Sequence, residues 1–125
     1  MLVTGRQGHQ ARAAALGRLR RQQGGATQAA ITADHGCPDV VCAHAGVVGV
    51  QKVQDYDLLD FDRLMSVNLR GSFVLAQVAS RAWLAAGVPG QVIFTSSWVH
   101  AVPWPEITPY AASKAGLIAF TSSLR

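Results

Sequence analysis

The sequence predicts an α/β fold built on a parallel β-sheet of the doubly wound type. Two apolar runs, residues 39–43 and 91–95, have the character of buried strands, and a long segment with helical periodicity separates them. Residues 1–5 are interpreted as the end of a further strand that runs into a glycine turn. Strands that alternate with helices favour a parallel sheet, whose ligands bind beyond the carboxyl ends of the strands. We therefore expect functional side chains where strands end.

The N-terminal part of the chain contains the less regular elements. Residues 10–23 are rich in Ala, Leu and Arg and predict a helix, which Gly24-Gly25 ends. Residues 29–33 could form a short strand. A turn at residues 36–38 then leads into the run 39–43, which is typical of a parallel strand covered on both faces.

A long helix is predicted between the two apolar runs. Asp60 is the expected N-cap of a helix over residues 61–86, and Gly87 is expected to end it. The expected apolar stripe of this helix comprises Phe61, Leu64, Met65, Phe73 and Ala76.

The C-terminal part places polar residues at a strand end. Ser96 and Ser97 directly follow the predicted strand 91–95, a position that suits function better than core packing. Residues 99–109 contain three prolines and are predicted to be a loop. A last helix is expected to begin at Tyr110 or its neighbour, and the helical pattern continues to the final residue.

Length and composition favour one soluble domain over residues 1–125, because half of the residues are apolar. The longest apolar runs are far shorter than the roughly 18 to 20 residues of a membrane span, and no secretory leader is recognisable. We expect a cytoplasmic protein without a membrane partner. Cys37 and Cys42 have the spacing of neither a redox motif nor a zinc ligand pair, so that even with His44 nearby no metal site is expected.

The net charge of +4 is concentrated near the N-terminus. Because aromatic residues are not interleaved with the basic ones, a solvated helix face is favoured over nucleic-acid binding, and binding of a cofactor phosphate is the alternative. Five arginines precede the first acidic residue, Asp34: Arg6, Arg12, Arg18, Arg20 and Arg21.

Tyr110 and Lys114 are the strongest candidates for chemistry. They are four residues apart in a segment with helical pattern, so both side chains project from one face of the helix. A free tyrosine has a pKa near 10, which is too high for ready proton exchange at neutral pH. A neighbouring ammonium group favours the phenolate, and the phenol then becomes a usable general acid or base.

The surroundings of this pair resemble a known family. Tyr110-Ala-Ala-Ser-Lys114 follows a strand that ends in Thr95-Ser96-Ser97, with Ser97 thirteen positions before Tyr110. Ala45-Gly46 follows a strand, as the family's Asn-Asn-Ala-Gly segment does, although Ala43-His44 replaces the two asparagines. Val67-Asn68 lies on the long helix, where the family has an asparagine. Residues 39–125 thus resemble the short-chain dehydrogenases/reductases of the classical type.

The resemblance implies a Rossmann-like fold and hydride transfer between NAD or NADP and a small-molecule carbonyl or alcohol. Tyr110 would give or take the hydroxyl proton, and Ser97 would hydrogen-bond the substrate oxygen. Lys114 would favour the phenolate of Tyr110 and hold the nicotinamide ribose, so that both residues also contact the cofactor. Asn68 would anchor a water molecule in the proton relay. The small residues of the Ala45-Gly46 segment would let the adenosine side of the cofactor approach.

The glycine turn matches the family only in part. Thr4, Gly5 and Gly8 are the candidate cofactor-binding residues of this turn, but the family's spacing would place the later glycines at about positions 9 and 11. Glycines are needed there because the backbone must approach the pyrophosphate at a helix N-terminus. No acidic residue precedes Asp34 to bind a ribose hydroxyl. The absence of an acidic residue and the presence of the arginines favour NADP over NAD.

The chain is expected to be an incomplete member, shortened over residues 1–38 and truncated after residue 125, since a full member continues with further elements. The family commonly forms tetramers through the long helix and the Tyr110 helix, so a homo-oligomer, a dimer or a tetramer, is expected. The alternative to an enzyme is an inactive remnant that serves as a binding or oligomerisation scaffold.

The loop before Tyr110 offers a hint about the substrate. Pro103-Trp104-Pro105 resembles the glucose 1-dehydrogenase branch of the family and points to polyols or sugars. Trp98 and Trp104 would equally suit packing at a subunit contact, because aromatic residues favour both settings.

Overall fold

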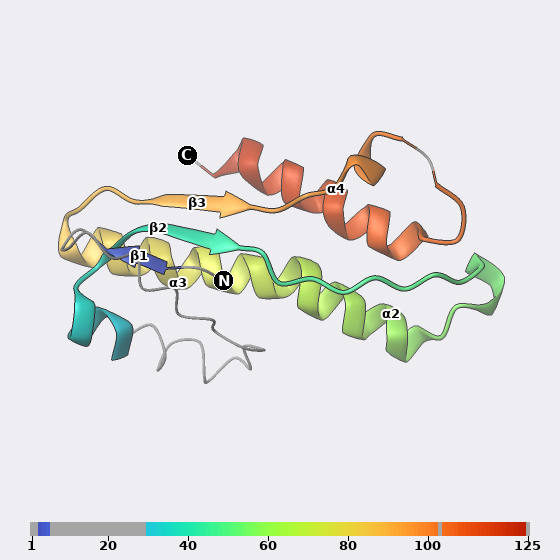
Figure 1. Cartoon of the computed structure of the whole chain (residues 1–125), viewed down its shortest axis with the longest axis horizontal. Coiled ribbons are helices and arrows are strands. Elements are labelled where there is room, and N and C mark those ends of the chain that lie inside the picture. The colour runs from blue at the N-terminus through green and yellow to red at the C-terminus, as the bar shows by residue number, and fades with distance from the viewer. Residues whose placement is uncertain (1–2, 6–29, 103, 125) are drawn as a thin grey trace. The chain divides into compact units, whose positions relative to one another are not determined.

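The computed structural model describes residues 3–5, 30–102 and 104–124 (Figure 1). The contacts between residues divide the chain into two compact units. Unit 1 comprises residues 1–44 and 73–93, and unit 2 comprises residues 45–72 and 94–125. Each unit is described by itself. The predicted helix over residues 10–23, together with Gly8 and the five arginines, lies outside the described residues.

Unit 1 contains a three-stranded sheet in the order β1-β2-β3. Its strands are β1 (Val3–Gly5), β2 (Pro38–Ala43) and β3 (Gln91–Phe94). The β2 and β3 arrows point the same way in Figure 1, as the prediction of parallel strands requires. Among the described residues of this unit, the buried apolar side chains include Val41, Ala43, Leu75, Ala76, Ala79 and Trp83.

The first strand does not follow the parallel prediction. β1 pairs with β2 in antiparallel register, with Val3 opposite Val41 and Gly5 opposite Pro38. A strand of three residues presents the same alternation of side chains in either direction, so its apolar pattern does not encode its direction of pairing. The expectation of a wholly parallel sheet is therefore wrong at this edge.

Residues 30–35 form a helix, so the predicted short strand over residues 29–33 is also wrong. Ala30 and Ala33 lie in this segment, and alanine has the highest helix propensity of all residues. The helix ends at Gly36, whose φ of 78° lies in the left-handed region and whose N–H donates to the Thr32 carbonyl at 3.0 Å. This arrangement is a common glycine C-cap.

The predicted long helix is present but has a wider central segment. It consists of α2 (Leu58–Met65), the π-helical segment η2 (Ser66–Arg70) and α3 (Gly71–Ala86). The chain leaves the helix at Gly87, as expected, with a φ of 62°. π-helical turns are rare and often occur at functional sites.

The N-cap and part of the apolar stripe differ from the prediction. Asp57 is the N-cap, since its carboxylate accepts a hydrogen bond from the Leu59 N–H at 2.6 Å, and Asp60 lies within the first turn. The structure buries Leu64 and Ala76 but exposes Phe61 and Phe73. The predicted stripe assumed one uniform α-helical period, and the π-helical segment changes that period between α2 and α3.

The remaining elements belong to unit 2. A short 3-10 helix, η1 (Val53–Asp55), precedes α2, and another, η3 (Trp98–His100), interrupts the predicted loop over residues 99–109. The last helix, α4 (Thr108–Ser123), starts two residues before Tyr110 because Pro109 is accommodated in its first turn.

In unit 2, α4 packs against α2 and η2. Gly116 permits a close approach here, since a Cβ atom at this position would lie 2.7 Å from Leu69 Cδ1. The buried residues of this unit include Leu64, Asn68, Val99, Ile107, Ser113, Lys114 and Leu117. In the described part of the chain, no helix is long and apolar enough to cross a membrane.

Candidate functional site

Unit 2 contains most of the residues that the sequence predicts to be functional. Gly46, Asn68, Tyr110 and Lys114 lie close together in it, as the contacts below show. Ala45 is exposed beside Gly46. The backbone of Thr4 and Gly5 belongs to β1 in unit 1, and Gly8 lies outside the described residues.

Lys114 brings a cationic group into the interior of this unit. Its residue surface is only 5% exposed, and Nζ donates a hydrogen bond to the Thr95 carbonyl at 2.7 Å. Nζ also lies 5.7 Å from the centroid of the Tyr110 ring. Burial lowers the pKa of Lys114 from its ordinary value of 10.5.

The ammonium group of Lys114 has donors to spare. An ammonium group has three N–H donors, and within the described residues only the Thr95 carbonyl accepts from one of them. No carboxylate of the described residues forms an ion pair with it. Buried lysines are usually paired, so this arrangement is expected where a ligand completes the hydrogen bonding.

Asn68 is fully buried, and its side-chain amide is engaged on both sides. Oδ1 accepts from the Val47 N–H at 2.8 Å, while Nδ2 donates to the Val47 carbonyl at 2.9 Å. Nδ2 also donates to Ser113 Oγ at 3.0 Å, and the Asn68 carbonyl accepts from Ser72 Oγ at 2.7 Å. The amide thus links the loop after β2 to α4 through the π-helical segment.

The side of Gly46 that lacks a side chain faces these two residues. A Cβ atom at this position would lie 3.4 Å from Lys114 Nζ and 3.5 Å from Asn68 Oδ1. Because glycine has no side chain, a ligand can approach the backbone here closely.

The hydroxyl groups of Ser97 and Tyr110 have no hydrogen-bond partner among the described residues. Ser97 precedes η3 with extended backbone and makes no capping bond with its side chain. Its carbonyl accepts from the His100 N–H at 3.3 Å and contacts His100 Nδ1. The structure shows no hydrogen bond from the Ser97 side chain to Asn68 or Lys114.

Three contributors to the site were not predicted from the sequence. Thr95 acts through its backbone carbonyl and Val47 through its backbone N–H and carbonyl, so their side chains give no signal in the sequence. Ser113 contributes its side chain, and it accepts from a residue 45 positions away. A serine in the middle of a helix usually bonds to its own helix, which gives no hint of such a partner.

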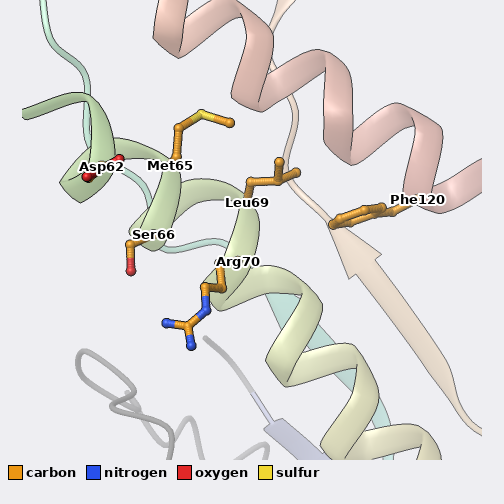
Figure 2. Close-up of a pocket in the computed structure, with 6 residues that line it drawn as sticks. All are labelled: Asp62, Met65, Ser66, Leu69, Arg70 and Phe120. Carbon is orange, nitrogen blue, oxygen red and sulfur yellow. The ribbon is translucent and has the colours of Figure 1, made fainter. Parts of the chain in front are cut away.

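An open pocket of about 470 Å³ lies away from these residues, also in unit 2. Figure 2 shows Met65, Leu69 and Phe120 pointing into the space between η2 and α4, whereas Ser66 and Arg70 point away from α4. None of the predicted site residues lines this pocket. Among the described residues, no cluster of His, Cys, Asp or Glu could hold a metal ion.

Comparison with known proteins gives a consistent result. The model of the short chain dehydrogenase family matches residues 4–125. The chain is similar to carbonyl reductase (NADPH) 2 of Sus scrofa, with 33% identity over 86 residues, which are 69% of this chain and 35% of that protein. The matched stretch spans about a third of the length of the curated relatives.

Solved structures show the same fold. A short-chain type dehydrogenase/reductase from Mycobacterium marinum has a TM-score of 0.79 and 29% identity, covering 84% of this chain and 43% of that one. NAD+-bound xylitol dehydrogenase has a TM-score of 0.77 and 27% identity, covering 83% of this chain and 40% of that one. The predicted Rossmann-like α/β fold, present only in part, is thereby confirmed.

Proposed function

Because the chain belongs to the short-chain dehydrogenase family, whose model matches residues 4–125, we propose that it is an NAD(P)-dependent oxidoreductase. Its reaction is hydride transfer between a nicotinamide cofactor and the carbon of a carbonyl or secondary alcohol. The observation that supports this most directly is the buried ammonium group of Lys114, which has unused donors and lies beside Tyr110 and Gly46.

The residues of unit 2 fit the nicotinamide end of such a cofactor. A ribose presents vicinal hydroxyl groups, and hydroxyl oxygens are suitable acceptors for the spare donors of Lys114. Gly46 leaves room at the same place. Lys114 and Tyr110 would hold the ribose, and Ala45 and Gly46 would let the cofactor pass close to the backbone. Thr4, Gly5 and Gly8 remain the predicted contacts for its phosphates.

Proton handling falls to the two free hydroxyl groups. A bound nicotinamide supplies or accepts the hydride. During reduction, the Tyr110 hydroxyl gives its proton to the substrate oxygen, and during oxidation the phenolate takes that proton back. The Ser97 hydroxyl donates a hydrogen bond to the same oxygen and orients it. Lys114 stabilises the phenolate because its positive charge lies near the Tyr110 ring.

The role that we propose for Asn68 differs in one detail from the role that the sequence suggests. The sequence suggests that Asn68 anchors a water molecule, yet both N–H donors of its side-chain amide are already used, by the Val47 carbonyl and Ser113 Oγ, and Oδ1 already accepts from the Val47 N–H. Its backbone carbonyl accepts from Ser72 Oγ, and a carbonyl oxygen has a second lone pair. We propose that Asn68 binds the relay water through this carbonyl and holds the loop at Val47 through its side chain.

The choice between the two cofactors rests on the N-terminal residues. One relative is named for NADPH and one structural neighbour is bound to NAD+. We propose a preference for NADP, since five arginines and no acid precede Asp34 and the extra phosphate of NADP needs a basic partner. The substrate is proposed to be a small carbonyl compound or alcohol, with polyols or sugars suggested by the loop at Trp104.

A titration of the chain with NADPH and with NADH, followed by nicotinamide fluorescence, tests this proposal. We expect saturable binding, weakened about tenfold or more in Lys114→Met, which corresponds to the loss of about one charged hydrogen bond. Lys52→Met is the matched control, because Lys52 is the only other lysine and is exposed. Tyr110→Phe should abolish turnover of carbonyl substrates, whereas Tyr56→Phe should retain it.

Absence of NADPH and NADH binding would favour the alternative function. A folded chain that binds neither nucleotide would leave the alternative, a remnant that acts as a binding or oligomerisation scaffold. Several large apolar side chains of unit 2 are exposed and would suit such a role. They are Val48, Val50, Val53, Leu58, Leu59, Trp98, Val102, Trp104 and Ile118.

A further inference from the structure

Ser113 is fully buried on α4, directly before Lys114, and its hydroxyl makes two hydrogen bonds. Its oxygen accepts from Asn68 Nδ2 at 3.0 Å, and its proton is donated to the Tyr110 carbonyl at 2.7 Å. Three other hydroxyl groups of α4 bond, among the described residues, only to carbonyls of their own helix. They belong to Thr121, Ser122 and Ser123.

The direction of these bonds determines the orientation of the Asn68 amide. A serine hydroxyl has one proton, and Ser113 donates it to the Tyr110 carbonyl, so toward Asn68 it acts as an acceptor. Only the NH2 end of the amide can face an acceptor. With the amide reversed, Oδ1 would face two oxygens, Ser113 Oγ and the Val47 carbonyl, and the Val47 N–H would face an NH2 group.

The orientation of Asn68 in turn holds the loop at Gly46. Asn68 accepts from the Val47 N–H and donates to the Val47 carbonyl, so it clamps both backbone groups of the residue after Gly46. The vacant Cβ position of Gly46 lies within 3.5 Å of both Asn68 Oδ1 and Lys114 Nζ. Ser113 therefore connects the first turn of α4, which holds Tyr110, to the loop that lies beside Lys114.

From this chain of contacts we propose that Ser113 is a positioning residue of the site. Ser113 fixes the orientation of the Asn68 amide. That amide in turn fixes the backbone of Val47 and Gly46 relative to Tyr110 and Lys114. The proposal rests on the proposed function for its consequence, because it is the cofactor that would contact Gly46. The contacts are made between residues of the chain itself, and this permits a test that does not depend on binding or turnover.

Hydrogen exchange of the Val47 N–H in the full chain measures the clamp directly. In Ser113→Ala, Asn68 Nδ2 loses an acceptor, so we expect exchange at Val47 to accelerate roughly tenfold, the size expected for one buried hydrogen bond. The Leu117 N–H in α4 is the internal reference, because general destabilisation would accelerate both amides. Only a positioning role changes the ratio of the exchange rate at Val47 to the exchange rate at Leu117.

Three further variants sharpen this test. Ser123→Ala removes a hydroxyl that bonds three residues back on the same helix but has no asparagine partner, so it should leave the ratio unchanged. Ser113→Thr keeps a hydroxyl that can bond three residues back and should retain slow exchange at Val47. Ser113→Cys preserves the volume with a weaker acceptor and should accelerate Val47 even if the alanine variant does not fold.

The results separate this proposal from the proposed function. Unchanged exchange at Val47 in the Ser113 variants, or equal acceleration at Val47 and Leu117, would overturn the positioning role. Absence of NADPH and NADH binding by the unmodified chain would instead overturn the proposed function. Where the cofactor binds, Ser113→Ala should weaken its binding and Ser123→Ala should not.

Discussion

Lys114 is a residue whose burial opposes folding. A charged group without a carboxylate partner loses hydration when it is buried, and one hydrogen bond to the Thr95 carbonyl replaces only part of it. Replacement of buried ions by apolar side chains of similar volume is often neutral or stabilising by roughly 1–4 kcal/mol. A buried charge at such a position is explained better by function than by stability.

A dependence of stability on pH follows from this burial. Burial lowers the pKa of Lys114 below 10.5 in the folded chain, so the unfolded chain holds the proton to higher pH. The free energy of unfolding should therefore rise with pH between the folded pKa and about 10.5, while below that window the full penalty of the buried charge is present. Urea unfolding of the unmodified chain and of Lys114→Met over this range measures the effect.

The variant should be at least as stable as the unmodified chain at pH 7, and the difference should shrink as the pH rises. Lys52→Met serves as the control, because Lys52 is exposed and its removal should leave the pH profile unchanged. Stability curves of the unmodified chain and Lys114→Met that stay parallel over the whole range would contradict a buried charge at this position.

At the scale of elements, the N-cap of α2 lies about one turn before the residue that the sequence predicts. Asp57 and Asp60 both precede apolar residues and both suit an N-cap by residue type. The side chain of Asp57 accepts from the Leu59 N–H, whereas Asp60 lies in the first turn, where its charge only complements the helix dipole. The two aspartates therefore form a matched pair for mutation.

Asp57→Ala should lower the free energy of unfolding by about 1 kcal/mol, as expected for the loss of an N-cap. Asp60→Ala should lower it by roughly half of that or less, because an exposed charge near the helix start contributes only a few tenths of a kcal/mol. Denaturant unfolding of the two variants under the same conditions compares them. A larger loss in Asp60→Ala would show that the cap lies where the sequence pattern suggests.

For the whole molecule, the open pocket between η2 and α4 suggests self-association. Met65, Leu69 and Phe120 present apolar surface there, and Asp62 and Arg70 provide charges at its border. The family resemblance places subunit contacts on the same two helices. An interface between identical copies is self-complementary, so that one substitution affects both sides of the contact.

Sedimentation velocity of the full chain should therefore show a mass above the 13.2 kDa of the single chain. Ser66→Arg introduces a large side chain at the exposed border of the pocket and should shift the chain toward the monomer. Ser122→Arg places the same group on the exposed side of α4 away from the pocket lining and should not. A chain that is monomeric without any substitution would refute the expected homo-oligomer.

The features that could be predicted from the sequence depend on residues that are close together along the chain. Strands β2 and β3, the end of the long helix at Gly87 and the helix with Tyr110 and Lys114 were all predicted, because apolar periodicity and glycine punctuation act over a few residues. The Tyr110 and Lys114 pair followed from helical spacing alone. Its assignment to a function needed the resemblance, because the spacing also occurs in helices without any activity.

The contacts between residues that are distant along the chain could not be predicted and are known from the folded structure. Asn68 forms hydrogen bonds with Val47, 21 positions away along the chain, and with Ser113, 45 positions away. Lys114 forms a hydrogen bond with Thr95, 19 positions away. The folded structure also shows the antiparallel pairing of β1 and the π-helical segment that buries Asn68. Hydrogen-bond partners of this kind are selected by the packing of whole elements, and a backbone carbonyl or a serine hydroxyl offers the same groups wherever it occurs. The physical reason is that a sequence pattern specifies which face of an element is apolar, but not which atom of another element will lie against it.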